Sequence, residues 1–268
     1  MIYSILAACA VLASQVSAAC TREMLQGAAA VYVKAQTTGQ PDLPFADSLN
    51  YTENDAVTDV KKGILSQAIT IDFNRSIYDT TQCATFTEIT AATNKKPYVI
   101  HWRMVFTDNK ITTAHSLVAK DGDWAFNAAG HLKWTKTEKW ESIPEAKRDT
   151  RAVIKAAGDA YLDSWGDSKI KPPYGAPCTR LEGGSYTSGA NPTTNTCTMP
   201  AFPQALKCGN RRYVIDEELG AVDIFNDFPF IDKAKPNGAP SGNFMRVEGG
   251  QLRYIHENTI CTKKGCAK

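Results

Sequence analysis

One hairpin motif occurs twice in this chain, and its recurrence limits the fold more than any other feature. The stretch Arg212–Phe228 (RYVIDEELGAVDIFNDF) predicts a β-hairpin, with Gly220 supplying the positive φ of a tight turn. The stretch Arg75–Ile89 (RSIYDTTQCATFTEI) follows the same plan, and in both an Arg stands four positions before an Asp. A duplicated hairpin predicts two similar modules.

Other features recur around the two hairpins in the same order. Alanine-rich amphipathic segments precede them at Glu23–Gln36 and Arg151–Trp165, and each segment predicts a helix. Tyr32 and Glu53 are 21 positions apart, as are Tyr161 and Glu182. After each hairpin a pair of extended runs ends in a strand that carries a histidine, His115 or His256. These agreements favour tandem duplication over two unrelated halves.

The first residues have the pattern of a secretion signal. The run Ile2–Val16 is almost wholly apolar, and small residues follow at Ser17, Ala18 and Ala19. The run is too short to span a bilayer. We therefore expect export to the extracellular space, with a signal peptide at 1–19, a first module at 20–120, a connector at 121–148 and a second module at 149–268.

Charge and aromatic residues limit the partners. The chain has thirty basic and twenty-eight acidic side chains, which gives a net charge of +2. Neither nucleic acid nor a membrane surface is therefore an expected partner. The connector carries Trp124, Phe126, Trp134 and Trp140, which predict a segment packed across the module interface. We expect a monomer that contains an internal pseudo-dimer.

Cysteine usage is typical of an exported protein. Without the signal, seven cysteines remain and many pairings are open. We favour Cys178 with Cys197, Cys261 with Cys266 and Cys20 with Cys83, which leaves Cys208 free. The sequence has no CxxC or HxxxH spacing, so neither a metal nor another cofactor is predicted. Asn50 and Asn74 begin glycosylation sequons.

The two-residue period of a strand predicts which face each terminal histidine occupies. In the first module, one face of the last strand carries Ile111, Thr113, His115 and Leu117. In the second module, one face of the last strand carries Leu252, Tyr254, His256, Asn258 and Ile260. Both histidines are therefore predicted to point toward the apolar side of their own module. His101 and Arg103 have the opposite parity from Trp102 and are expected at the solvent or the rim, and His131 is expected in a linker.

Several short motifs resemble one family. Tyr51–Asn54 after the first helix, the hairpins RMVFTDNKIT and FMRVEGGQLRYIH, and the trailing DGDW at 121–124 look like the SnoaL-like branch of the nuclear-transport-factor-like superfamily. The tandem arrangement is similar to uncharacterised secreted fungal proteins of that superfamily. The resemblance implies an α+β fold of two tandem cones, in which helices pack on a curved antiparallel sheet. It also implies a pocket between sheet and helix, used by cyclases, isomerases, dehydratases, hydrolases and binding proteins.

The resemblance and the repeat together suggest candidate site residues. Carboxylate and imidazole pairs suit acid–base chemistry without a cofactor, so the catalytic candidates are Glu53 with His115 and Glu182 with His256. Further residues are candidates for ligand binding: Tyr51, Arg75, Tyr78, Asp79, Arg212, Tyr213, Asp216 and Tyr254.

Each of these candidates also has a structural interpretation. A histidine on an apolar strand face is often a core residue, an Arg and an Asp four apart can form an ion pair at a sheet edge, and Glu53 can cap a helix. The expected function is a secreted, cofactor-independent isomerase, lyase or hydrolase of a small, partly apolar metabolite such as an aromatic ether, polyketide or terpenoid. The alternatives are a small-molecule-binding protein and a host or surface interaction protein.

Overall fold

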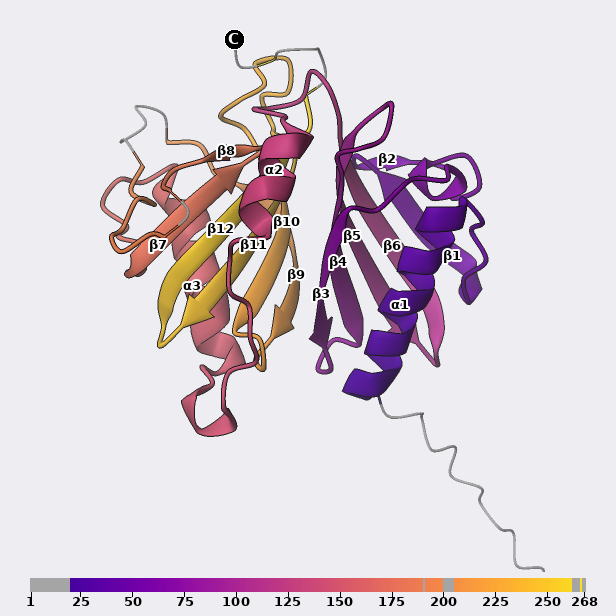
Figure 1. Cartoon of the computed structure of the whole chain (residues 1–268), viewed down its shortest axis with the longest axis horizontal. Helices are drawn as coiled ribbons and strands as arrows, with labels where there is room; N and C mark the ends of the chain where they lie inside the picture. The colour runs from indigo at the N-terminus through magenta and orange to yellow at the C-terminus, as the bar shows by residue number, and fades with distance from the viewer. Residues whose placement is uncertain (1–19, 190, 200–204, 262–265, 267–268) are drawn as a thin grey trace, which may run out of the picture.

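Two halves of similar architecture make up the structure, a computed structural model that describes residues 20–189, 191–199, 205–261 and 266 (Figure 1). The expected signal peptide at 1–19 lies outside these residues. Among the described helices, none is long and apolar enough to cross a membrane.

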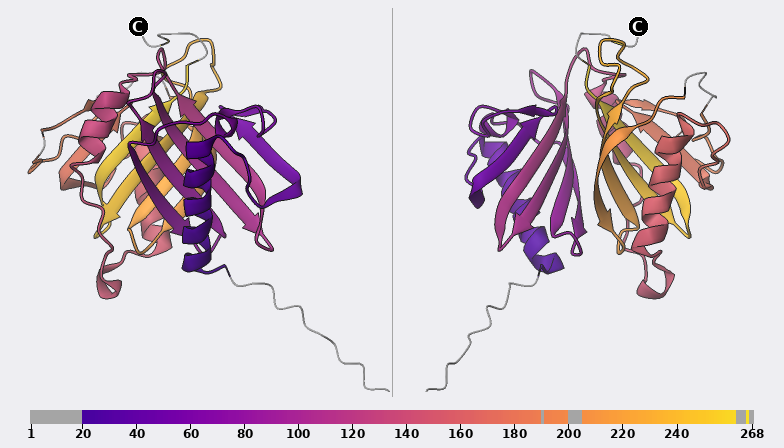
Figure 2. Two further views of the ribbon diagram at one scale, coloured as in Figure 1. Left: turned by 45° about the vertical axis from the view of Figure 1, so that its right-hand side comes forward. Right: turned by 180° about the vertical axis from the view of Figure 1, so that it is seen from behind.

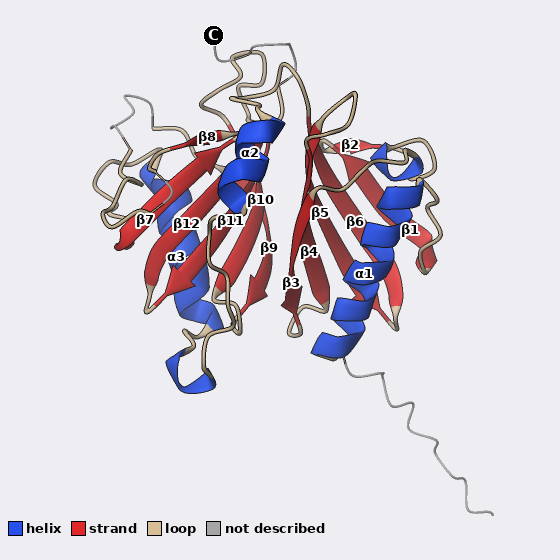
Figure 3. Cartoon of the chain, viewed as in Figure 1, coloured by secondary structure: helices blue, strands red, loops and turns tan. Residues whose placement is uncertain are grey.

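Helices are few and strands are many (Figure 3). The helices are α1 (Arg22–Thr38), α2 (Ala128–Thr135) and α3 (Arg151–Ser164), with 3₁₀ turns η1 (Ile64–Ser66) and η2 (Glu145–Lys147). The strands of the first half are β1 (Phe45–Glu53), β2 (Ala56–Val57), β3 (Phe73–Asp79), β4 (Ala84–Ala91), β5 (Tyr98–Thr107) and β6 (Lys110–Ala119). Those of the second half are β7 (Tyr174–Glu182), β8 (Ser185–Tyr186), β9 (Gly209–Asp216), β10 (Ala221–Phe228), β11 (Ala239–Glu248) and β12 (Gln251–Thr259).

The two halves have the same sheet topology. The strand orders are β2-β1-β6-β5-β4-β3 and β8-β7-β12-β11-β10-β9. In each sheet one pair is parallel, β1 with β6 and β7 with β12, and the other pairs are antiparallel. The predicted α+β class and tandem halves are therefore confirmed. The expected antiparallel sheets are wrong in one respect, because the parallel pair makes each six-stranded sheet mixed.

A capped amphipathic helix covers one face of each sheet. Thr21 caps α1 by accepting a hydrogen bond from the backbone N of Met24 at 3.2 Å, and Thr150 caps α3 by accepting one from Val153 at 3.4 Å. The α1 helix buries Leu25, Tyr32 and Ala35 in a core with its own sheet. The α3 helix forms the corresponding core in the second half. We call these two spaces the first interior and the second interior.

The other faces of the two sheets pack against each other, with α1 and α3 on the outside (Figure 2). A third core fills this space, to which the first half contributes Phe86 and Leu117 and the second half Phe225 and Phe244. We call this space the seam. Because both faces of each sheet are covered, β4 is buried along its whole length.

A β-bulge in each last long strand reverses the alternation of side chains. In β6 the register skips Thr112, and in β12 it skips Arg253. Ile111 and Leu252, before the bulges, therefore lie in the interior cores, whereas His115 and His256, after them, face the seam. The prediction that each histidine shares a face with these apolar residues is wrong for this reason.

Two reciprocal ion pairs join the halves across the seam. Asp216 accepts hydrogen bonds from both terminal nitrogens of Arg22 at 2.9 and 3.0 Å, and Asp79 accepts two from Arg151 at 2.7 Å each. Each carboxylate also accepts a backbone N–H of the opposite half, from Tyr78 to Asp216 and from Ile215 to Asp79. We call these contacts the two clamps.

The clamps correct the expected pairing within each hairpin. Arg75 contacts Thr135 and Glu88, and Arg212 pairs with Asp55 at 2.8 Å, so neither arginine pairs with the aspartate four residues on. The cause is the docking of the two halves, which places an arginine from a helix of the opposite half, Arg22 or Arg151, beside each aspartate.

The cysteine predictions are confirmed. Disulfides join Cys20 to Cys83, Cys178 to Cys197 and Cys261 to Cys266, and Cys208 is free and buried. The first ties the start of α1 to the turn before β4, and the second closes the polar excursion after β8. The side chains of both sequon residues, Asn50 and Asn74, are exposed.

The aromatic connector packs across the seam as its composition predicts. Trp140 stacks on Phe244 of β11 with ring centroids 4.5 Å apart, and the guanidinium of Arg75 from β3 lies 4.5 Å from the Trp140 ring. Trp134 stacks on Tyr186 of β8. The connector therefore contacts both sheets and covers one side of the seam.

Candidate functional site

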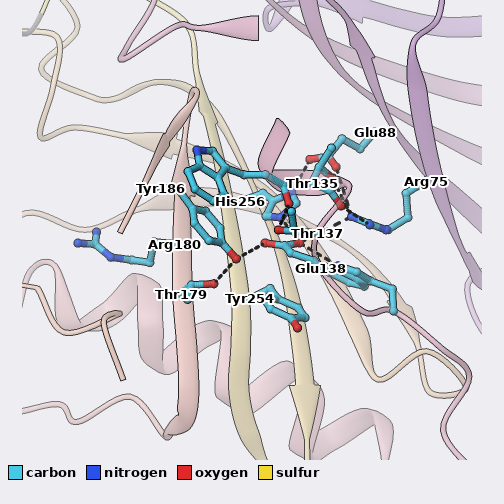
Figure 4. A network of polar contacts seen from close by, with 12 residues as sticks. Arg75, Glu88, Thr135, Thr137, Glu138, Thr179, Arg180, Tyr186, Tyr254 and His256 are labelled. Carbon is cyan, nitrogen blue, oxygen red and sulfur yellow. Dashed lines mark hydrogen bonds and ion pairs between the residues drawn. The ribbon is translucent and has the colours of Figure 1, made fainter. Parts of the chain in front are cut away.

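A group of ionisable side chains lies buried in the seam beneath the connector. Glu88 comes from β4, His101 from β5, His131 from α2, Glu138 from the connector and His256 from β12. We call these five residues the seam cluster, most of which Figure 4 shows. The chain has four histidines, and three of them are in this cluster.

Three imidazoles surround one carboxylate oxygen in the cluster. Oε1 of Glu88 lies 2.8 Å from Nδ1 of His256, 3.4 Å from Nε2 of His101 and 3.5 Å from Nε2 of His131. Burial alone would raise the pKa of Glu88, but the charges of His256 and His131 hold it well below its usual range. Glu88 is therefore an anion inside the protein.

Further partners orient these histidines. Nε2 of His256 is 2.7 Å from Oε2 of Glu138, and Nδ1 of His131 is 2.8 Å from the hydroxyl of Thr90. Burial would lower the pKa of His256, but Glu138 and Glu88 raise it to about 9. Glu138 also accepts a hydrogen bond from the hydroxyl of Tyr186 at 3.3 Å, so the network continues to β8 (Figure 4).

The seam cluster has no second copy at the equivalent positions of the other half. At the equivalent ladder positions, Glu88 and His101 of the first half correspond to Phe225 and Gly242 of the second. A Cβ on Gly242 would lie 2.5 Å from Nδ1 of His101, so the absence of a side chain there leaves room for the ring. His115, the counterpart of His256, meets Phe225 instead of a carboxylate.

The second interior holds a different polar group. Arg180 and Glu182 on β7 form an ion pair, and Glu257 on β12 stands beside Glu182 in the ladder. Burial, and next the charge of Glu182, raise the pKa of Glu257 to about 8. Burial and the same carboxylates hold the pKa of Tyr161, on α3, well above its usual range. The result is two carboxyl groups, a guanidinium and a phenol converging between α3 and its sheet.

Aromatic side chains fill the corresponding space of the first half. Trp102 is fully buried and stacks on Tyr32 at 4.6 Å, with Tyr51 at 5.5 Å. At the ladder position of Trp102 the second half has Asn243, which donates to Asn226 at 2.8 Å. Only the second interior therefore combines smaller polar side chains with a carboxyl pair.

A surface pocket lies next to the second interior. It has a volume of about 240 Å³ and is lined by Ser164, Lys171, Tyr174, Thr198 and Met199, among others. Burial raises the pKa of Tyr174 to about 12, and Arg180 opposes this shift. Tyr174 therefore links the pocket to the arginine of the interior.

The structure separates the carboxylate and histidine pairs predicted from the sequence. Side chains paired across a ladder share a face, and Glu53 pairs with Ser116 while Glu182 pairs with Glu257. Each glutamate is therefore on the opposite face from its predicted histidine, His115 or His256. These two predicted pairs are wrong.

Glu53 has the structural role that the sequence left open. Its Oε2 accepts from the backbone N of Ile64 at 2.7 Å at the start of η1, and from the hydroxyl of Tyr51 at 2.9 Å. Glu182 stays a candidate for catalysis, in the second interior.

The other predicted binding residues are dispersed. Tyr78 lies beneath the guanidinium of Arg22, and Tyr213 donates to Asp159 at 2.8 Å. Asp79 and Asp216 form the clamps, and Arg212 joins Asp55. Only Arg75 and Tyr254 border the seam cluster, Tyr254 through Trp140.

Sequence reasoning missed Glu88, Glu138, Glu257, Arg180 and the role of His131. His101 and Arg103 are buried and not at the solvent, because the second sheet covers their face. The prediction that they lie on the opposite strand face from Trp102 is correct, and the prediction that this face is at the solvent or the rim is wrong.

His115 should make stability depend on pH. Burial, and next the charges of Arg212 and Arg103, lower its pKa to about 4, and only Asp55 opposes them. Between about pH 4 and pH 6.5 the unfolded chain therefore binds a proton at His115 that the native state does not bind. The contribution of His115 to the free energy of unfolding is full above about pH 6.5 and decreases below it. Between pH 8 and pH 5 the wild-type protein should lose about 2 kcal/mol more than His115→Gln, measured by urea denaturation. Equal losses would contradict a neutral, buried His115.

One known protein family matches part of the chain. A family described as a domain of unknown function (DUF8021) matches residues 147–259. The second half thus matches a family without an assigned activity. The matched range runs from η2 through α3 to the end of β12, so it includes the second interior and His256. No curated protein and no solved structure matches the chain significantly.

Proposed function

We propose that this protein is an exported enzyme that acts by acid–base chemistry on a small, partly apolar molecule, in the second interior. The observation that carries the proposal is the convergence of Arg180, Glu182, Glu257 and Tyr161 in a space that Trp102 fills in the other half. Two duplicated spaces, one filled and one polar, are what retention of a site in one copy would produce.

The groups present suit proton transfer without a cofactor. Two adjacent carboxyl groups cannot both ionise easily, so one is available as an acid and the other as a base. Arg180 and Tyr161 are donors for an oxygen that gains negative charge. The reaction class would be isomerisation, elimination or hydrolysis next to a carbonyl or ether oxygen.

The fold and the disulfides support the same proposal. A helix against a mixed sheet, repeated in tandem, agrees with the SnoaL-like resemblance, in which the ligand lies between helix and sheet. Three disulfides are typical of proteins in oxidising compartments, which supports export. The pocket beside Tyr174 is the proposed entrance.

Turnover of a defined panel tests the function. Small aryl ethers, lactones, epoxides and cyclic enones suit the proposed chemistry and the pocket of about 240 Å³ at the proposed entrance. For any compound that is converted, Glu257→Gln and Glu182→Gln should each lower kcat/KM by about 100-fold or more. The matched control is Glu53→Gln, at the position equivalent to Glu182, which should leave kcat/KM unchanged.

Native mass spectrometry separates catalysis from binding alone. If protein from its own source retains a small molecule that Glu257→Gln retains equally, and no panel compound is converted, the protein is a binding protein. If Glu53→Gln abolishes turnover as fully as Glu182→Gln, the site is not in the second interior.

A further inference from the structure

We infer that Glu88, His131 and His256 bind one divalent transition-metal ion in the seam, which fastens the two sheets and the connector together. The ligand atoms of these three buried residues all lie within 4.8 Å of one another. They come from β4, α2 and β12, so one ion would join the first sheet, the connector and the second sheet. The inference is independent of the proposed acid–base site, which lies on the other face of the second sheet.

The distances are close to those of a metal site. Ligand bonds of about 2.0 Å in a tetrahedron place neighbouring ligand atoms about 3.3 Å apart. The distance from Glu88 Oε1 to His131 Nε2 is 3.5 Å, and to His256 Nδ1 it is 2.8 Å. The second must widen by roughly half an ångström to fit that tetrahedron, a small rotation of one imidazole. His101 Nε2 lies 3.4 Å from the same oxygen.

Each histidine ligand has a partner on its other nitrogen. Glu138 holds Nε2 of His256, and the Thr90 hydroxyl holds Nδ1 of His131. Carboxylate and hydroxyl partners of this kind fix the ring orientation and tautomer of metal-binding histidines. With these partners in place, Nδ1 of His256 and Nε2 of His131 are directed at the same oxygen of Glu88, the first in a hydrogen bond that a bound ion would replace.

Charge and unsatisfied atoms leave a place for a cation. A metal-bound His256 is neutral, and Glu88 and Glu138 then contribute two negative charges against the one positive charge of Arg75, which lies 3.8 and 3.9 Å from them. Among the described residues, Oε2 of Glu88 and both ring nitrogens of His101 have no hydrogen-bond partner. Such buried atoms require an explanation, and an ion is one.

The ligand types select the metal. Two imidazoles and one carboxylate suit Zn²⁺ and its first-row neighbours, whereas Ca²⁺ and Mg²⁺ prefer oxygen ligands alone. The ligands are almost fully buried, which is typical of structural sites. The competing explanation is that a proton on His256 supplies the missing charge.

Metal content tests the inference. Elemental analysis of the full chain purified from its own source, and after dialysis against Zn²⁺, should give one metal per protein. Co²⁺ in its place should give the visible absorption of a low-symmetry site with nitrogen ligands. His131→Ala and Glu88→Gln should each lose the bound ion, and Zn²⁺ should raise the Tm of the wild-type protein by about 5 °C or more.

A matched histidine provides the control. His115→Ala removes the counterpart of His256 outside the cluster and should keep one ion per chain. Circular dichroism and intact disulfides would show that His131→Ala is folded, and Glu88→Gln is a second variant of nearly unchanged shape. If folded His131→Ala and Glu88→Gln bind as much Zn²⁺ and Co²⁺ as the wild-type protein, or if the wild-type protein binds neither, the inference is wrong and the proton on His256 balances the charge.

Discussion

Asp216→Ala should lower the free energy of unfolding by about 3 to 5 kcal/mol, because it breaks a largely buried ion pair by removing one partner. Asp216 is 1% exposed and receives two hydrogen bonds from Arg22 and one from the backbone of Tyr78 across the seam. Without the carboxylate, the N–H of Tyr78 and both terminal nitrogens of Arg22 lose this buried partner, although Arg22 keeps Glu218 at 3.4 Å. Urea denaturation followed by tryptophan fluorescence measures the loss.

The second clamp should behave in the same way. Asp79→Ala removes the partner of Arg151 and of the backbone N of Ile215, so we expect a similar loss. The two effects together should approach the total stability of an ordinary domain, about 5 to 15 kcal/mol. The double variant is therefore expected to be largely unfolded at room temperature.

Another ion pair across the seam serves as the control. Asp55 pairs with Arg212, but its side chain is 22% exposed. Asp55→Ala should cost about 1 kcal/mol, because the carboxylate of this pair is partly open to solvent. If Asp55→Ala and Asp216→Ala cost the same, the clamps are ordinary surface pairs, and the seam is held by its apolar core alone.

Trp102→Ala should cost about 3 to 5 kcal/mol, the usual loss when a large buried aromatic side chain is truncated. Trp102 has no exposed surface and stacks on Tyr32, with Tyr51 beside it. The truncation leaves a cavity between α1 and its sheet. Indole, which has the shape of the deleted group, should restore part of the stability in thermal unfolding, since a ligand that binds only the native state stabilises it.

Trp134 provides the comparison for this variant. It lies on the connector, is partly exposed and stacks on Tyr186. Trp134→Ala should cost about 1.5 kcal/mol or less, within the worth of an aromatic pair, and indole should not stabilise it. A small loss for Trp102→Ala, or no response to indole, would mean that Trp102 does not fill the first interior. Turnover in the second interior should survive either change in the folded protein.

Local sequence patterns were sufficient to predict the two long helices, the strands and their repetition in two halves. The spacing of apolar residues predicts α1 and α3, and the equal separations of Tyr32 from Glu53 and of Tyr161 from Glu182 correspond to matching helix and strand positions. The pairing of Cys178 with Cys197 follows from the polar excursion that they enclose. These features depend on neighbours in the sequence, so the sequence carries them.

The candidate site was predictable only in part. Glu182 does lie in an interior, but its partners there are Arg180 and Glu257 instead of His256. The error arises at one residue, since the bulge at Arg253 turns every later side chain of β12 to the opposite face. A simple two-residue period has no means of placing such a bulge.

The sequence by itself determined two α+β halves, their helices and their disulfides, because periodicity, spacing and cysteine chemistry act over short stretches of chain. Only the tertiary structure decided what covers the second face of each sheet. It buried His101 and gave Asp79 and Asp216 partners from the opposite half. It also brought Glu88 within hydrogen-bonding distance of His256, 168 positions away. Side chains so far apart in sequence meet because of how two sheets dock, and no local pattern encodes that contact.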